Sequence, residues 1–142
     1  MSHGLTRTGH GLLACFLACL LCVGMACCGQ QAPLTPEEQA SQAAKRCYEA
    51  LYNGHPEAFL NGRLQASAMP QSYRQQQLDV YRQHAAQMEK QHSGVRRIDV
   101  SRAAMDSTLN VMQVFLQLAF GDNTMEEIVV PMVEHEGQWM MK

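Results

Sequence analysis

Residues 111–120, VMQVFLQLAF, decide the fold of this chain. Every second side chain is apolar, which gives one face composed of Met112, Val114, Leu116, Leu118 and Phe120. The other face alternates with it and is half polar, composed of Val111, Gln113, Phe115, Gln117 and Ala119. A period of two residues predicts a β-strand, and such unequal faces are typical of a sheet that is covered fully on one side only.

Further strands are predicted on both sides of this stretch. Before it, Ile98, Val100 and Arg102 are expected on one face of a strand that begins near Val95. After it, the turn Gly121-Asp122-Asn123 leads to a strand with Ile128, Val130 and Met132 on one face. Pro131 places that strand at a sheet edge or at a bulge. The turn Glu136-Gly137 precedes a last strand over residues 139–142.

Three helices are predicted before the strands. Thr35, Pro36 and Glu38 form a capping box with proline at the first helical position, and the helix ends at Asn53-Gly54. A short helix covers residues 55–60, and Pro70 opens a long one that ends near His92. Helices followed by strands indicate an α+β domain over residues 35–142, with three N-terminal helices packed on a curved four-stranded antiparallel sheet.

The first 26 residues are interpreted as an export signal. Residues 12–28, LLACFLACLLCVGMACC, carry no charge and follow Arg7. An apolar core of about 7–15 residues is typical of a signal peptide, whereas a spanning helix needs roughly 20 apolar residues. These residues are therefore not assigned to the folded domain.

A lipid-modified cysteine is predicted directly after this signal. Ala26-Cys27 resembles the site at which bacterial signal peptidase II cuts before a diacylglyceryl cysteine, which predicts lipidation of Cys27, with Cys28 as the alternative. A plain secretory signal is the other interpretation, but no A-x-A-like site is present. Residues 27–34 then form the lipidated cysteine and a short tether. The chain is expected in the bacterial cell envelope, in the outer membrane facing the periplasm.

Charge and cysteine content exclude several classes of function. Removal of residues 1–26 takes Arg7 from the 11 basic residues and leaves ten against 13 acidic ones, a net charge of −3. A weakly acidic domain lacks the basic footprint that nucleic acids require. Five of the six cysteines lie in or beside residues 12–28, so neither a disulfide framework nor a metal site is indicated. No cofactor is predicted.

Two stretches carry a family resemblance: residues 44–54, AKRCYEALYNG, and residues 120–142, FGDNTMEEIVVPMVEHEGQWMMK. Together with the order of helices and strands, they resemble small bacterial lipoproteins that carry a domain of unknown function, family 4878. That family lies within the nuclear transport factor 2-like, cystatin-like superfamily. The resemblance covers residues 35–142 and implies a cone-shaped fold and the localisation of a lipoprotein. It implies no activity, because this superfold hosts enzymes, binders and assembly modules alike.

The favoured function is a non-enzymatic domain that binds or scaffolds an envelope protein or a small apolar ligand. Its expected ligand-facing residues are those of the half-polar strand face, Val111, Gln113, Phe115 and Gln117. The alternative is a small ketosteroid-isomerase-like enzyme, which would pair a tyrosine with a carboxylate in an apolar pocket. Its candidate side chains are Tyr48, Tyr52, Tyr73, Tyr81, Asp99 and Asp106.

Cys47 and the histidines have simpler interpretations. Cys47 lies on the apolar stripe of the first helix and is expected to act as a small hydrophobic residue rather than a reactive thiol. His84 and His92 lie eight residues apart on one helix, about 12 Å along its axis, which is too far to share a metal ion.

The anchor prediction is tested by substitution. Cys27→Ala is expected to abolish metabolic labelling with a fatty acid and to release the domain in soluble form, because the thiol is the group that takes the lipid. Labelling that survives Cys27→Ala and disappears in Cys28→Ala would move the site to Cys28. Labelling unaffected by either substitution would contradict the lipoprotein interpretation.

Overall fold

The computed structural model describes residues 32–142. The predicted signal over residues 1–26 and the two candidate lipidation sites, Cys27 and Cys28, lie outside the described residues and stay predictions. Within residues 32–142, no helix has both the length and the apolar character that a membrane span requires.

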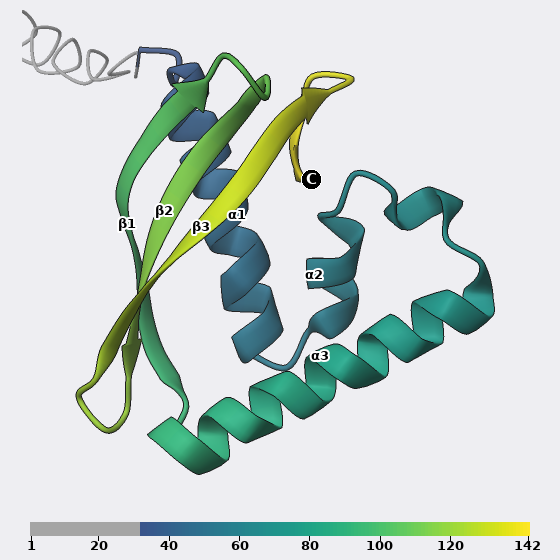
Figure 1. Cartoon of the computed structure of the whole chain (residues 1–142), viewed down its shortest axis with the longest axis vertical. Coiled ribbons are helices and arrows are strands. Elements are labelled where there is room, and N and C mark those ends of the chain that lie inside the picture. The colour runs from purple at the N-terminus through teal and green to yellow at the C-terminus, as the bar shows by residue number, and fades with distance from the viewer. Residues whose placement is uncertain (1–31) are drawn as a thin grey trace, which may run out of the picture. The chain divides into compact units, whose positions relative to one another are not determined.

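Helices come first and strands follow, as predicted (Figure 1). The helical part consists of α1 (Pro36–Tyr52), α2 (Pro56–Asn61), the single-turn helix η1 (Ala66–Ala68) and α3 (Gln71–His92). The strands are β1 (Val95–Asp106), β2 (Val111–Phe120), β3 (Met125–His135) and β4 (Gln138–Met141). They form one antiparallel sheet in the order β1-β2-β3-β4, so the predicted α+β arrangement is confirmed.

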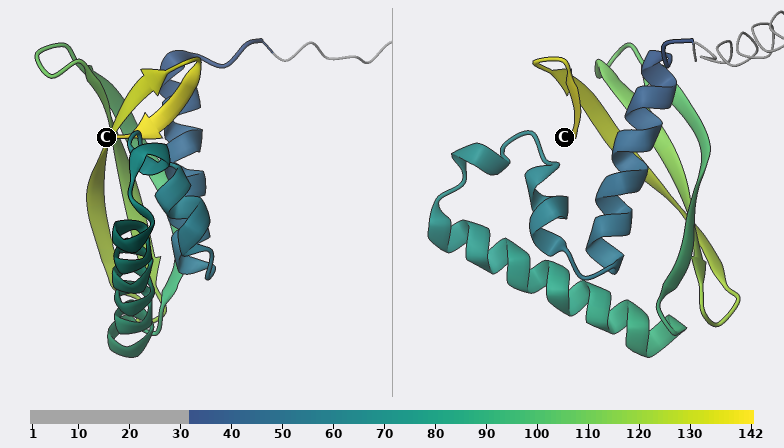
Figure 2. Two further views of the ribbon diagram at one scale, coloured as in Figure 1. Left: turned by 90° about the vertical axis from the view of Figure 1, so that its right-hand side faces the viewer. Right: turned by 180° about the vertical axis from the view of Figure 1, so that it is seen from behind.

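The helix α1 lies along one face of the twisted sheet, and α2 packs against α1 on the same side (Figure 2). The core between helices and sheet contains the apolar face predicted for residues 111–120, and Val114 and Leu116 have no exposed surface. Ala40 and Ala44 of α1 are equally buried. Their small side chains let the helix lie close to the strands, so burial of apolar surface between α1 and β2 stabilises both elements.

The predicted capping box starts α1. The Thr35 hydroxyl accepts a hydrogen bond from the Glu38 backbone N–H at 3.2 Å, and the Thr35 backbone N–H donates to the Glu38 carboxylate at 2.8 Å. Pro36 takes the first helical position. The helix ends at Tyr52, and Gly54 follows with a φ of 84°, which glycine adopts without strain.

The structure corrects the predicted placement of Arg102. Register shifts lie between Val95 and Arg97 and between Val100 and Arg102. Ile98 and Val100 pair with Leu118 and Leu116 of the core face, but Arg102 pairs with Phe115 of the opposite face. The additional residue at Ser101 forms a β-bulge, which changes the alternation, so Arg102 does not share a face with Ile98 and Val100.

Pro131 lies where β3 changes from an edge strand to an inner one. Pairing between β3 and β4 begins at Met132, so the chain before it is an edge, as proline predicts. Beyond β4 lies the segment after α2: the Leu64 backbone N–H donates to the Met141 carbonyl, and the Met141 N–H donates to the Gly62 carbonyl, both at 2.8 Å. These bonds cover the outer edge of the last strand.

The long helix α3 is less buried than its apolar stripe suggests. Leu78 is its one buried residue, and the rest of the predicted face, from Tyr81 through Ala85 and Met88 to His92, is half-buried. The C-terminal end of α3 is fixed to the β2–β3 turn, because the Asp122 backbone N–H donates to the His92 carbonyl at 3.0 Å. The remainder extends away from the strands (Figure 1).

Candidate functional site

The sheet face that points away from the helices is the candidate site, called here the outer face. Cross-strand pairing places its residues in rows that each run from β1 through β2 to β3. The rows are Arg97–Ala119–Met125, Asp99–Gln117–Glu127, Arg102–Phe115–Val129 and Ala104–Gln113–Pro131. The outer face thus combines apolar side chains near its centre with amides and charges of both signs.

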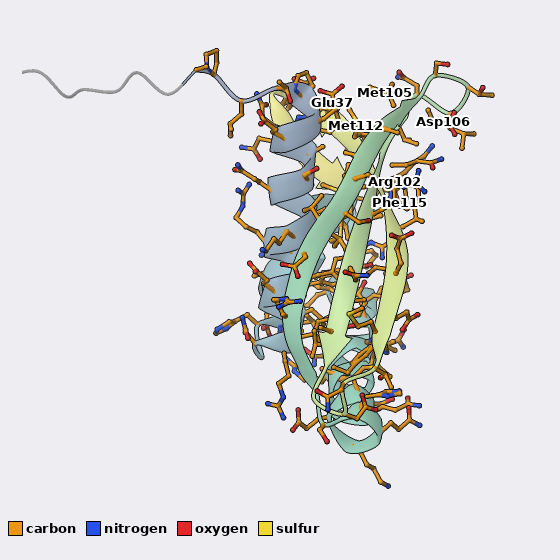
Figure 3. The ribbon with its side chains drawn as sticks, turned by 90° about the vertical axis from the view of Figure 1, so that its left-hand side faces the viewer. Glu37, Arg102, Met105, Asp106, Met112 and Phe115 are labelled. Carbon is orange, nitrogen blue, oxygen red and sulfur yellow. The ribbon has the colours of Figure 1, made fainter. Side chains whose placement is uncertain are left out.

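Arg102 and Phe115 form the centre of the outer face. The Arg102 guanidinium carbon lies 3.5 Å above the centroid of the Phe115 ring, a cation–π contact (Figure 3). Beside it, the hydroxyl of the bulge residue Ser101 donates a hydrogen bond of 2.8 Å to the Glu127 carboxylate. The bulge therefore brings both Ser101 and Arg102 to this surface, and it holds an aromatic ring and a guanidinium together.

Three of the four residues predicted to face a ligand are accessible on this surface. Gln113, Phe115 and Gln117 are half-buried. Val111 is only 2% exposed, which removes it from the predicted ligand-facing set. It pairs with Asp106 at the end of β1, where the two strands turn, and a residue so covered offers no contact surface.

Two further apolar residues on the outer face were not predicted. Val129 and Met125 of β3 are 49% and 61% exposed. The sequence pattern of this strand predicted only its core-facing residues, Ile128, Val130 and Met132. Only the register with β2 shows that Val129 stands opposite Phe115 and extends the apolar centre.

Three of the four candidate tyrosines of the enzyme alternative, Tyr48, Tyr52 and Tyr81, pack against the core on the opposite side of the sheet, whereas Tyr73 is exposed. The Phe59 ring packs edge-on between Tyr48 and Tyr81, with centroid distances of 5.2 and 4.9 Å. Tyr52 packs beside Tyr48, and its hydroxyl lies 3.1 Å from His84 Nε2. Burial is the main cause that raises the pKa of Tyr52 to about 12.

The candidate carboxylates lie elsewhere. Asp99 belongs to the outer face and accepts a 2.6 Å hydrogen bond from Arg97 Nε. Asp106 accepts hydrogen bonds from the backbone N–H groups of Thr108 and Leu109 in the β1–β2 turn. The sheet therefore separates both aspartates from Tyr48, Tyr52 and Tyr81, which pack against its core face, and the expected tyrosine–carboxylate pair is not formed.

Cys47 and the histidines have structural contacts. Burial raises the pKa of the Cys47 thiol, although Arg46 lowers it somewhat, so little thiolate is present at neutral pH. His92 Nδ1 lies 2.9 Å from an Asp122 carboxylate oxygen and His84 lies beside Tyr52. Among residues 32–142, no three side chains of the kinds that hold metal ions come together.

Comparison with solved structures identifies the fold. A Campylobacter jejuni protein, described as an NTF2-like transpeptidase, matches with a TM-score of 0.58 and 14% sequence identity. The match covers 70% of this chain and 94% of that one. The chain has the NTF2-like fold. No family model matches the sequence, and neither does any curated protein. At this identity the likeness concerns the NTF2-like fold alone.

The raised pKa of Tyr52 predicts a late phenolate signal. Because the folded-state pKa of about 12 exceeds the ordinary value of 10, the contribution to stability is complete below pH 10 and is lost as the pH rises toward 12. Tyr52→Phe is expected to reduce the phenolate absorbance that develops near pH 12, recorded immediately after a pH jump; burial also raises the pKa of Tyr48, so a smaller late component can remain. Tyr73→Phe, at an exposed position, serves as the control and keeps the late component at full size. A late component that is undiminished in Tyr52→Phe would contradict the assignment.

Proposed function

We propose that this chain is a lipid-anchored protein of the bacterial cell envelope whose NTF2-like domain binds another envelope protein through its outer face. One observation carries the proposal. Phe115 and Val129 form an accessible apolar centre on a sheet face that no helix among residues 32–142 covers, and the exposed Met125 lies two rows away at the end of the same face. The activity is binding or scaffolding, without chemistry on the partner.

The composition of the outer face suits protein recognition. Aromatic residues, methionine and arginine are enriched in protein interfaces, where they supply most of the binding energy. Here the ring of Phe115 is already held by Arg102 at 3.5 Å, so little side-chain freedom is lost when a partner covers it. Gln113 and Gln117 flank the ring with amides that can donate and accept hydrogen bonds.

A protein partner is favoured over the small apolar ligand. Small ligands are enclosed in concave sites, which bury most of their surface. In the part of the chain that the structure describes, the hollows between α1 and β1, between α1 and β4 and on either side of Leu64 are lined without Gln113, Phe115 or Gln117. A broad face of three strands matches the extended contact that a protein makes.

The predicted lipid anchor would keep the domain close to other proteins of the envelope. If Cys27 carries the lipid, with Cys28 as the alternative, Leu34 follows seven positions later in the sequence, and an extended tether of this length reaches at most about 25 Å. Several acyl chains, each contributing about 0.8 kcal/mol per buried CH₂, would hold the protein at the membrane. The domain would then meet partners at the periplasmic surface of the outer membrane.

Enzymatic alternatives have less support. The ketosteroid-isomerase-like reaction requires a carboxylate close to a tyrosine, and Asp99 and Asp106 lie across the sheet from the tyrosine cluster. The Campylobacter protein is described as a transpeptidase. A thiol nucleophile for that reaction needs a lowered pKa, whereas burial raises the pKa of Cys47, the one cysteine in residues 32–142.

Substitutions on the two faces of β2 test the proposal. Phe115→Ala and Gln117→Ala are expected to reduce recovery of partner protein in envelope pull-downs while lowering stability by about 1 kcal/mol or less, since both side chains are half-buried. Met112→Ala and Leu116→Ala should instead destabilise the domain by about 2–5 kcal/mol, because they empty core sites. Thermal melts and pull-downs on the four variants provide both measurements.

The adjacent residues Phe115 and Leu116 form the matched pair in this experiment. They belong to one strand and differ chiefly in the face from which they project. If Phe115→Ala unfolds the domain as severely as Leu116→Ala, both faces are structural and the binding proposal fails. Unchanged recovery of partners by a folded Phe115→Ala protein would equally exclude the outer face as the binding surface.

A further inference from the structure

We propose that a second site on the domain, separate from the outer face, binds a small carboxylate. The site is a hollow with a volume of about 180 Å³, lined by Arg63, Leu64, Gln65, Met69 and Lys142. It lies between the segment that joins α2 to α3 and the end of β4. Its anion-binding groups would be the side chains of Arg63 and Lys142.

The walls of the hollow are fixed by backbone hydrogen bonds. Leu64 donates to Met141 at 2.8 Å, and Lys142 donates to the Pro131 carbonyl at 2.9 Å, which fixes both ends of the site to the sheet. Gly62, at the end of α2, lets this segment lie close to α1, since a β-carbon there would lie 2.4 Å from Cys47 Sγ. The pocket is therefore formed before any ligand binds, which lowers the entropic cost of binding.

The Arg63 guanidinium at the hollow has no acidic side chain as a counter-ion. Among residues 32–142, no aspartate or glutamate side chain lies within ion-pair distance of Arg63 or Lys142. Arg63 Nη1 donates to the Tyr81 hydroxyl at 3.3 Å, a neutral partner that leaves the charge uncompensated. Arg74, close by, also has neutral partners, the Asn61 side chain and the Ala66 carbonyl. Arg63 itself is half-buried, which strengthens its attraction for an anion.

The shape and the remaining lining indicate the ligand class. The planar guanidinium matches a carboxylate with two parallel hydrogen bonds, and Gln65 can donate a further one. Leu64 and Met69 offer apolar contacts for a short hydrocarbon part. The volume of about 180 Å³ is small, which favours a short-chain carboxylate as the ligand.

The test uses sodium butyrate as the probe and the whole chain in detergent micelles. In titrations followed by ¹H–¹⁵N NMR, butyrate is expected to shift the amide signals of Leu64 and Gln65 saturably. At the same concentrations, n-butanol, which lacks the charge, should not. Arg63→Gln should weaken the affinity at least about tenfold, as expected for loss of a charged hydrogen bond. Arg82→Gln, whose cation pairs with Glu57 and Asp79, is the matched control and should bind as the unchanged protein does.

Lys142→Gln keeps the test valid if Arg63→Gln disturbs folding through its contact with Tyr81. Lys142 is exposed, so its substitution leaves the core intact, and it should also weaken butyrate binding. The proposal is overturned if the unchanged protein shows no saturable shift. It is likewise overturned if butanol matches butyrate, or if both charge-removing variants bind butyrate as tightly as Arg82→Gln does.

Discussion

The packing of α1 against the core face of β2 is the contact on which the rest of the domain depends. Ala40 and Ala44 give α1 an almost flat surface in the core that also contains Val114 and Leu116, and all four side chains are completely buried. Close packing of this kind determines which face of the sheet is buried away from solvent. Once that face is taken by the helices, the alternation along β2 turns Gln113, Phe115 and Gln117 outward.

Local signals were sufficient to predict most of the architecture. The capping box at Thr35, the one-sided alternation over residues 111–120 and the turns at Asn123 and Gly137 all depend on neighbours within a few residues, so the sequence contains them. The order of helices and strands then predicted the α+β fold. The half-polar face of β2 was likewise recognised from its own alternation.

Non-local features escaped prediction. The bulge at Ser101, which turns Arg102 onto Phe115, depends on the register between β1 and β2, and no residue within β1 specifies it alone. The burial of Val111 results from the way the strands meet at their turn. The hollow beside Arg63 forms where the end of β4 lies next to residues that are distant in sequence. Residue spacing along the chain therefore could not predict it.

Two surfaces of different character are thus proposed on the NTF2-like domain, an outer face with an aromatic centre for a protein and a cationic hollow for a small carboxylate. The first proposal requires that another protein covers the outer face in the envelope. Site-specific photocrosslinking in living cells tests it most directly, with the photoreactive residue at Gln117 on the outer face and, for comparison, at the exposed Gln83 of α3. The account predicts a discrete crosslinked protein from position 117 and none of comparable yield from position 83. Crosslinking from position 83 with none from position 117 would contradict it.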